Sequence, residues 1–141
     1  MDVLIQKVAL EETGEIMEPA DPGRVPADVL IVEDDPIIAL DFEDTILNLG
    51  VRSVRCAGSV ATALNLIAAR APDFALLDVG LTREKSFAVA GKLAALKIPF
   101  AFVTGYGADK VLPEFADYPR LPKPCSSAAL LAVLQRFARK C

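Results

Sequence analysis

Short apolar runs alternate with longer amphipathic segments from residue 28 to the end of the chain. The first run, residues 29–32, has the length and apolar content of a strand that is buried on both faces, and the others are also interpreted as strands. The runs cover residues 29–32, 53–57, 74–78, 99–104 and 120–121. In the segments between them, apolar residues recur three and four positions apart, which is typical of helices. The predicted helices cover residues 36–50, 59–71, 83–97 and 126–140.

Local signals predict where several helices begin and end. Pro36 suits the first turn of a helix and Gly50 suits its C-terminal stop, while Ser59 is a good N-cap for the next helix. The predicted buried stripes of the first and last helices comprise Ile38, Phe42, Ile46, Leu49, Leu130, Val133, Leu134 and Phe137.

Strand and helix alternate about five times, which predicts an α/β fold with a doubly wound, five-stranded parallel sheet. One segment departs from the pattern. Residues 106–117 are only weakly helical because Pro113 opposes a long helix. We therefore expect a shortened fourth helix region and a mobile segment over about residues 106–119.

The first 27 residues differ from the rest of the chain. They carry six acidic and two basic residues, whereas residues 28–141 carry thirteen of each. An apolar stretch at residues 3–10 suits a strand, and the following residues, up to 27, are rich in proline and acidic residues, as linkers often are. We interpret residues 1–27 as an N-terminal extension and linker, and residues 28–141 as one domain.

The composition excludes several classes of function. The chain is 53% hydrophobic and 24% charged, and it has no apolar run long enough to cross a membrane and no signal peptide pattern. Residues 28–141 have no basic excess, so a nucleic-acid partner is not expected. Three cysteines without close pairing favour the reducing cytoplasm. The absence of histidine excludes histidine metal sites and catalytic triads.

Polar and charged residues follow the predicted strands at their carboxyl ends. Glu33, Asp34 and Asp35 come directly after the first strand, and Asp78 ends the third. The carboxyl ends of parallel strands meet at one edge of a sheet, and clustered carboxylates there are the oxygen ligands that Mg²⁺ prefers. Taken alone, the three acids suit equally well a strand-to-helix turn in which Asp35 caps the helix.

Two further residues strengthen the interpretation of this edge as a site. Thr104 ends the fourth strand and Lys123 follows the fifth. A carboxylate such as Asp78 can attack phosphorus and form an aspartyl-phosphate. Such a transfer requires charge neutralisation around the phosphoryl oxygens, which a Mg²⁺ ion, a lysine and a threonine would supply.

Four stretches occur in the order and at the spacing of a known family: VLIVEDD, ALLDVGL, FVTGYG and LPKPC. Over about residues 28–140 the chain resembles the CheY-like receiver domain of bacterial two-component response regulators. The resemblance makes Asp78 the phosphoacceptor. It makes Asp34 and Asp78 direct Mg²⁺ ligands, with Glu33 assisting through water and the backbone carbonyl of Gly80 as a further ligand.

The same resemblance gives roles to the remaining residues of the edge. Thr104 and Lys123 would contact the phosphoryl group, and the peptide bond between Lys123 and Pro124 would be cis. The stretch PFAFVTGYG is similar to the FAT-GUY receivers, a subgroup of mostly single-domain regulators. A sensor histidine kinase or a histidine phosphotransfer protein would supply the phosphoryl group, and the output would be contact with a downstream protein.

The sequence also departs from the family pattern. Arg120 stands where most receivers have an aromatic switch residue, for which Tyr106 is a candidate substitute. Cys125 replaces the usual phenylalanine after the Lys-Pro pair, and is a candidate for redox sensitivity. Cys56, within a strand, is expected to be a small core residue.

Alternative functions remain open at this point. The chain could be the receiver part of a hybrid histidine kinase, or a pseudo-receiver whose interactions do not depend on phosphate. No segment after Lys140 is long enough for an output domain, which favours a stand-alone receiver. A haloacid-dehalogenase-type phosphatase is disfavoured because Gly80 stands where such enzymes need a second aspartate. We therefore expect a signalling module and not an enzyme.

Overall fold

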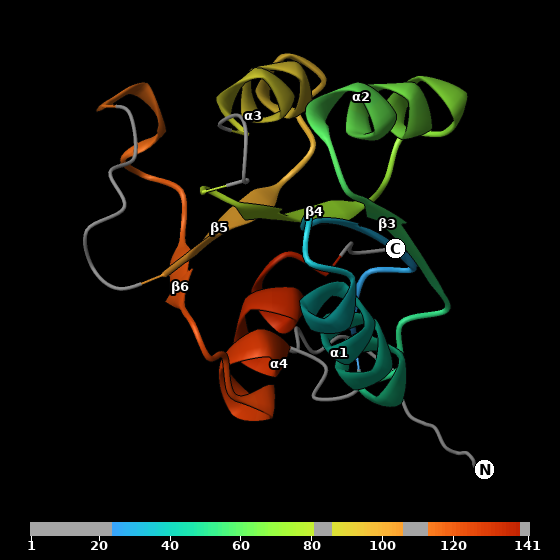
Figure 1. The fold of residues 1–141 in the computed structure, drawn as a ribbon. Coiled ribbons are helices and arrows are strands. Elements are labelled where there is room, and N and C mark those ends of the chain that lie inside the picture. The colour runs from blue at the N-terminus through green and yellow to red at the C-terminus, as the bar shows by residue number, and fades with distance from the viewer. Residues whose placement is uncertain (1–23, 81–85, 106–112, 139–141) are drawn as a thin grey trace, which may run out of the picture.

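The computed structural model describes residues 24–80, 86–105 and 113–138. Its strands are β2 (Asp28–Val32), β3 (Ser53–Ala57), β4 (Phe74–Asp78), β5 (Phe100–Thr104) and β6 (Arg120–Pro122). Its helices are α1 (Pro36–Asn48), α2 (Val60–Ala69), α3 (Phe87–Ala95), the 3-10 turn η1 (Pro113–Phe115) and α4 (Ser127–Arg136). Labels follow Figure 1.

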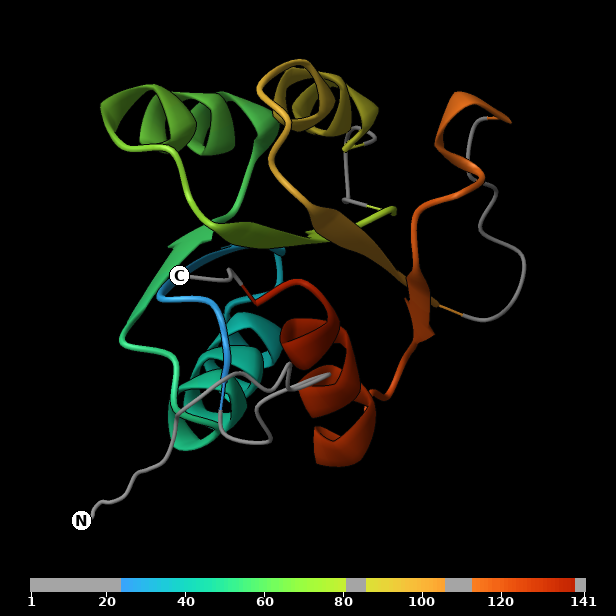
Figure 2. The ribbon, with the colours of Figure 1, turned by 180° about the vertical axis from the view of Figure 1, so that it is seen from behind.

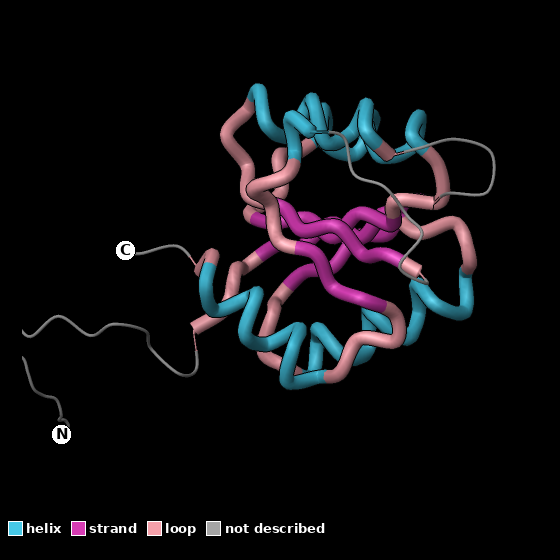
Figure 3. Tube along the Cα trace, turned by 90° about the vertical axis from the view of Figure 1, so that its left-hand side faces the viewer, coloured by secondary structure: helices cyan, strands magenta, loops and turns pink. Residues whose placement is uncertain are grey.

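The five strands form one parallel sheet in the order β3-β2-β4-β5-β6. Helices α2 and α3 cover one face and helices α1 and α4 cover the other (Figures 1 and 2). Seen from the side, the strands form a central layer between two layers of helices (Figure 3). The chain turns back across the sheet after β3, so the predicted doubly wound fold is confirmed.

Two apolar clusters fill the space between the sheet and its helices. In β2, Leu30 and Val32 belong to the cluster beneath α2 and α3, whereas Val29 and Ile31 belong to the cluster beneath α1 and α4. All four side chains are fully buried. A strand covered on both faces has no polar position, which explains why the sequence of β2 is a continuous apolar run.

The helix ends follow the predicted local signals. Asp35 caps α1, and its Oδ1 accepts hydrogen bonds from the N–H groups of Ile37 and Ile38. Gly50 follows α1 with a φ of +108°, a backbone conformation that residues other than glycine rarely adopt. Ser59 caps α2 through the N–H of Thr62. These caps satisfy backbone groups that a helix leaves without partners.

The connection from β5 to β6 contains the 3-10 turn η1 where a longer helix is usual in this topology, so the expected shortening holds for the described residues. Phe115 in this turn is buried, and the ring of Tyr118 stacks on Phe100 with a centroid distance of 4.0 Å. Residues 106–112 lie outside the described residues. The mobility of residues 106–119 stays a prediction, although the later residues of that range pack on the core.

One expectation is wrong. Cys56 is exposed and does not belong to the core. Strand β3 lies at the edge of the sheet, so it has a neighbouring strand on one side only, and its Cys56 position faces outward beside Glu43 on α1. Although the residue is exposed, its sulfur atom is partly shielded from water, and this desolvation, together with the Glu43 carboxylate, raises the pKa of the Cys56 thiol to about 11.

Most of the N-terminal extension lies outside the described residues, including the stretch that suits a strand. Residues 24–27 are described, and within them Val25 packs against the apolar cluster under α1 and α4. Within the described part of the chain, the structure holds no helix with the length and hydrophobicity that a membrane crossing requires.

Candidate functional site

The carboxyl ends of β2 and β4 bring three predicted acids together. The two strands are neighbours, and their register pairs Val32 with Leu77, so the next residues, Glu33 and Asp78, lie side by side. One carboxylate oxygen each from Glu33, Asp34 and Asp78 lies within 4.8 Å of the other two. Glu33 and Asp78 are buried, with 4% and 5% of their surface exposed.

Lys123 reaches this acidic cluster from beyond the fifth strand. Its Nζ lies 3.0 Å from Glu33 Oε1 and 3.4 Å from Asp78 Oδ2. The backbone N–H of Lys123 donates to the Thr104 carbonyl at 2.8 Å, which extends the pairing of β5 with β6 by one residue. The Lys123–Pro124 peptide bond is cis, as expected.

The ion pair between Lys123 and Glu33 is an interaction that the sequence did not predict. Burial raises the pKa of the Glu33 carboxyl, while the hydrogen bond from Lys123 and the N–H of Asp35 oppose that rise. Burial alone would lower the pKa of Lys123, but its hydrogen bond to Glu33 and the charge of Asp78 raise it overall. The ammonium group is therefore held charged between two buried carboxyl groups.

Both carboxylate oxygens of Glu33 contact donors of the protein itself. Oε1 accepts from Lys123, and Oε2 accepts from the Asp35 N–H at 3.1 Å. Asp78 Oδ1 accepts from the Gly80 N–H at 3.1 Å, while its Oδ2 faces Lys123. Glu33 is thus oriented by two partners, and one oxygen of Asp78 lies beside a cation.

Thr104 lies at the same edge of the sheet. Because Asp78 pairs with Val103 in register, Thr104 is one step beyond the end of β4 and partly exposed. The structure therefore brings Glu33, Asp34, Asp78, Thr104 and Lys123 to one rim. The predicted roles of the Gly80 carbonyl and of the Thr104 hydroxyl stay predictions.

Two of the residues that depart from the family pattern, Arg120 and Cys125, belong to the described residues. Arg120 is exposed, and its Nη2 donates to the Ala116 carbonyl at 3.3 Å, so its side chain is held by the preceding turn. Tyr106 lies outside the described residues. Cys125 is half-buried and its thiol donates to the Pro122 carbonyl at 3.3 Å; burial raises the pKa of this thiol. A raised pKa disfavours the reactive thiolate form.

Comparison with known proteins agrees with this geometry. Residues 29–135 match the sequence family described as the response regulator receiver domain. This chain belongs to the response regulator receiver domain family. The match covers the sheet except for its first residue, Asp28, and most of α4, and the five-stranded parallel sheet is the fold of such domains.

Two solved structures of SdrG and one curated protein illustrate the similarity. The solution structure of SdrG from Sphingomonas melonis Fr1 is 40% identical, with a TM-score of 0.70, and the match covers 79% of this chain and 95% of that one. SdrG in its BeF3-activated conformation, from Pseudomonas melonis Fr1, is also 40% identical, with a TM-score of 0.68 over 78% and 94% of the two chains.

The curated protein is the transcriptional regulatory protein PdtaR of Mycobacterium tuberculosis. It is 27% identical over 117 residues, which represent 80% of this chain and 57% of that protein. This chain thus spans little more than half the length of the curated relative that it matches. The similarity concerns the receiver domain.

Proposed function

We propose that this chain is a phosphoacceptor signalling module in which Asp78 accepts a phosphoryl group from a sensor histidine kinase or a histidine phosphotransfer protein. One observation carries the proposal: the buried Asp78 lies in a cluster of three carboxylates with the Lys123 ammonium 3.4 Å from its Oδ2. Phosphoryl transfer depends mainly on positioning and charge neutralisation, and this arrangement provides both. The output is contact with a downstream protein.

The residues present fit a Mg²⁺ ion. Three carboxylates with oxygens within 4.8 Å of one another form the oxygen-rich environment that this hard cation prefers. Asp34, Asp78 and the Gly80 carbonyl would hold the ion, and Glu33, whose Oε1 accepts a hydrogen bond from Lys123 at 3.0 Å, would assist through water. When bound, Mg²⁺ neutralises negative charge on the phosphoryl oxygens.

The proposed reaction is a transfer between two side chains. An Asp78 carboxylate oxygen attacks phosphorus of the phosphohistidine, an O–P bond forms and the N–P bond breaks. The leaving imidazole regains its lone pair, so no oxidant or further reactant is needed. Lys123 and Thr104 bind the phosphoryl oxygens in their new position. Later hydrolysis by water returns Asp78 to the carboxylate and releases inorganic phosphate.

Similarity to SdrG supports this proposal. SdrG adopts an activated conformation with BeF3, which is a mimic of a phosphoryl group, and it is 40% identical to this chain. SdrG has nearly the length of the matched region, which supports a stand-alone receiver. On the stretch PFAFVTGYG we further assign the chain to the FAT-GUY subgroup. The free thiols of Cys56 and Cys125 support a cytoplasmic location.

The test is phosphorylation by a small donor. The protein is incubated with Mg²⁺ and acetyl phosphate, and the mass of the intact chain and of its peptides is measured. We expect one phosphoryl group on Asp78, and none when Mg²⁺ is replaced by a chelator. Asp78→Asn should abolish the adduct. The matched control is Asp35→Asn, which removes a neighbouring carboxylate but keeps a good helix cap, and should leave the adduct unchanged.

An unmodified wild-type chain, under conditions that label a receiver domain of proven activity, would contradict the proposal. That result would favour the alternative of a phosphate-independent pseudo-receiver. An adduct that persists in Asp78→Asn would place the phosphoacceptor at another residue.

A further inference from the structure

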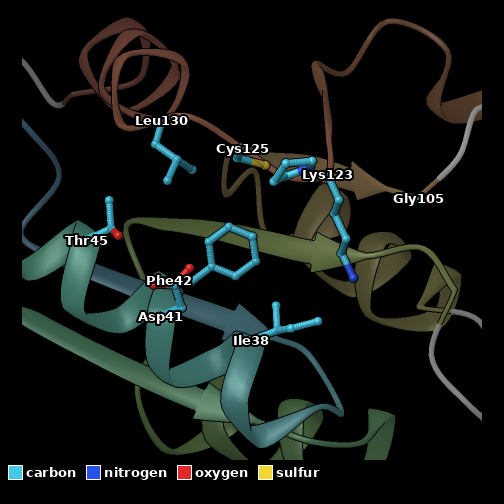
Figure 4. Close-up of a pocket in the computed structure, with 9 residues that line it drawn as sticks. Ile38, Asp41, Phe42, Thr45, Gly105, Lys123, Cys125 and Leu130 are labelled. Carbon is cyan, nitrogen blue, oxygen red and sulfur yellow. The ribbon is translucent and has the colours of Figure 1, made fainter.

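A cavity of about 440 Å³ opens between α1 and α4, beside the phosphoacceptor rim. Its walls are mainly apolar. Figure 4 shows Ile38, Phe42 and Thr45 on α1 facing Leu130 on α4, with Cys125 and Lys123 on the connection after β6. This volume lies within the range of protein sites that bind a ligand or a partner's side chains.

Apolar surface continues from the cavity onto α1. Ile37, next to the cavity residue Ile38, is 78% exposed. The other exposed apolar residue in this part of the helix, Leu40, faces away from the cavity and lines a second pocket beside Cys56. An exposed isoleucine next to an apolar cavity adds apolar surface that a bound segment can cover.

The chain itself enters the fold on this side. Val25 packs against the apolar cluster that also contains Phe42 and Leu130, two residues that line the cavity. In Figure 2 the first coloured residues run along the α1–α4 side of the sheet. The described part of the chain therefore begins on the face that carries the cavity, and 23 residues precede it in the sequence.

The N-terminal extension has a segment that suits this surface. Residues 3–10, VLIQKVAL, contain six apolar residues out of eight, and Lys7 is their one charged residue. The cavity is also lined by the exposed Asp41, whose charge complements Lys7. The 13 residues from 11 to 23 are polar, acidic or turn-forming for the most part, as a linker is.

The linker has the length that the geometry requires. A flexible chain of this length has a root-mean-square end-to-end distance of roughly 20 Å. Helix α1, whose C-terminal end lies near Val25, has 13 residues and is about 20 Å long, and the cavity is lined along it from Ile38 to Thr45. Every part of the cavity wall on α1 is therefore within reach of the linker, and a short flexible linker gives the tethered segment an effective concentration in the mM range.

We infer that residues 3–10 bind in the cavity between α1 and α4 and cover Cys125. The segment is held by apolar contacts with Ile38, Phe42 and Leu130. Since Lys123 and Gly105 belong to the same cavity, a bound segment narrows the approach of a protein partner to Asp78. The extension thereby acts as a built-in competitor for that approach.

The native cysteines provide the test. The rate of alkylation is measured separately for each thiol of the full chain by peptide mass, at one alkaline pH and without Mg²⁺ or phosphodonor. Leu4→Asp combined with Ile5→Asp should expose Cys125. If the effective concentration exceeds the segment's dissociation constant about tenfold, Cys125 should react about ten times faster in this variant. Cys56, on the far edge of the sheet, is the internal reference and should keep its rate.

The matched control adds the same two charges to the linker, as Ile16→Asp with Met17→Asp, and should leave the Cys125 rate at its wild-type value. A peptide of residues 1–12, added to the Leu4→Asp/Ile5→Asp variant, should slow its Cys125 reaction again. The substituted residues of both tail variants precede the described residues, so neither variant removes a contact of the described fold.

Two outcomes would overturn the inference. Equal Cys125 rates in the wild type and in the Leu4→Asp/Ile5→Asp variant would show that the segment does not cover the cavity. A wild-type rate that falls with rising protein concentration would show that a second copy covers it instead. The measurement does not involve Asp78, so its failure leaves the proposed phosphoacceptor function untouched, and the reverse also holds.

Discussion

The two ends of strand β2 carry acids in opposite circumstances. At its amino end, Asp28 accepts hydrogen bonds from two guanidinium groups: Arg55 at 2.7 and 3.3 Å, and Arg70 at 3.3 Å. Arg55 also donates to the carbonyls of Leu66 and Arg70, which close the end of α2. This network joins β2, β3 and α2. In it, the charge of Asp28 is neutralised by arginines of the protein itself.

At the carboxyl end of the same strand, negative charge is concentrated. Glu33, Asp34 and Asp78 lie within 4.8 Å of one another, and Lys123 bridges two of them. Burial disfavours the charged form of Glu33 and raises the pKa of its carboxyl. The comparison teaches that this fold can neutralise a strand-end acid with arginines when only stability is at stake. The acidic end holds three carboxylates and one lysine, which fits the proposed binding of Mg²⁺ there.

The largest expected change in the free energy of unfolding concerns Asp28, at the amino end of strand β2. Asp28→Ala leaves the Arg55 guanidinium, whose side chain is 16% exposed, without its carboxylate partner. Removing one partner of such a pair should lower the free energy of unfolding by about 3 kcal/mol. Urea denaturation measures it. The control Asp117→Ala, at an exposed position, should stay within about 0.5 kcal/mol of the wild type. Equal losses in both variants would contradict a structural role for the Asp28 network.

The next effect tests the acidic end. A ligand that binds only the native state stabilises it, by about 2.7 kcal/mol at a concentration of 100 times its dissociation constant. We expect Mg²⁺ to raise the unfolding free energy of the wild type by this mechanism, and Asp34→Asn to lose most of the gain. Asp35→Asn should keep it. A Mg²⁺ gain that is equal in the wild type and in Asp34→Asn would place the ion elsewhere.

In the absence of Mg²⁺, we expect Asp78→Asn to change stability less than Asp28→Ala does, and in the opposite direction. Asp78→Asn removes a buried charge that repels Glu33, while Lys123 keeps its 3.0 Å contact with Glu33. The variant should be at least as stable as the wild type, by up to about 1 kcal/mol. Thermal unfolding in a chelating buffer measures this. A clear loss of stability would mean that Asp78 supports the fold, and would weaken the contrast between the two ends.

The smallest effect separates the two arginines. Arg70 is 61% exposed in its side chain, whereas Arg55 is largely buried, although both contact Asp28. Arg70→Met should cost less than about 1 kcal/mol, as exposed ion pairs do. Arg55→Met, the matched substitution, should cost clearly more because it also removes donors to the end of α2. Similar losses of stability in Arg70→Met and Arg55→Met would show that the exposure of an arginine does not determine its contribution to this network.

Much of this architecture follows from the sequence alone. The apolar runs predicted the strands, because a strand covered on both faces has no polar position. Asp35, Gly50 and Ser59 predicted helix ends, because capping depends on local backbone groups. The acidic rim was predicted as well, because residues that follow parallel strands meet at one edge of the sheet.

Only the tertiary structure decided which neighbours these residues have. The position of β3 at the edge of the sheet exposes Cys56, although its strand looks like a core strand in sequence. The contact of Lys123 with Glu33 joins residues 90 positions apart, and that of Arg55 with Asp28 joins residues 27 apart. Such contacts depend on strand order and register, which arise from the packing of the whole sheet and which no local pattern encodes.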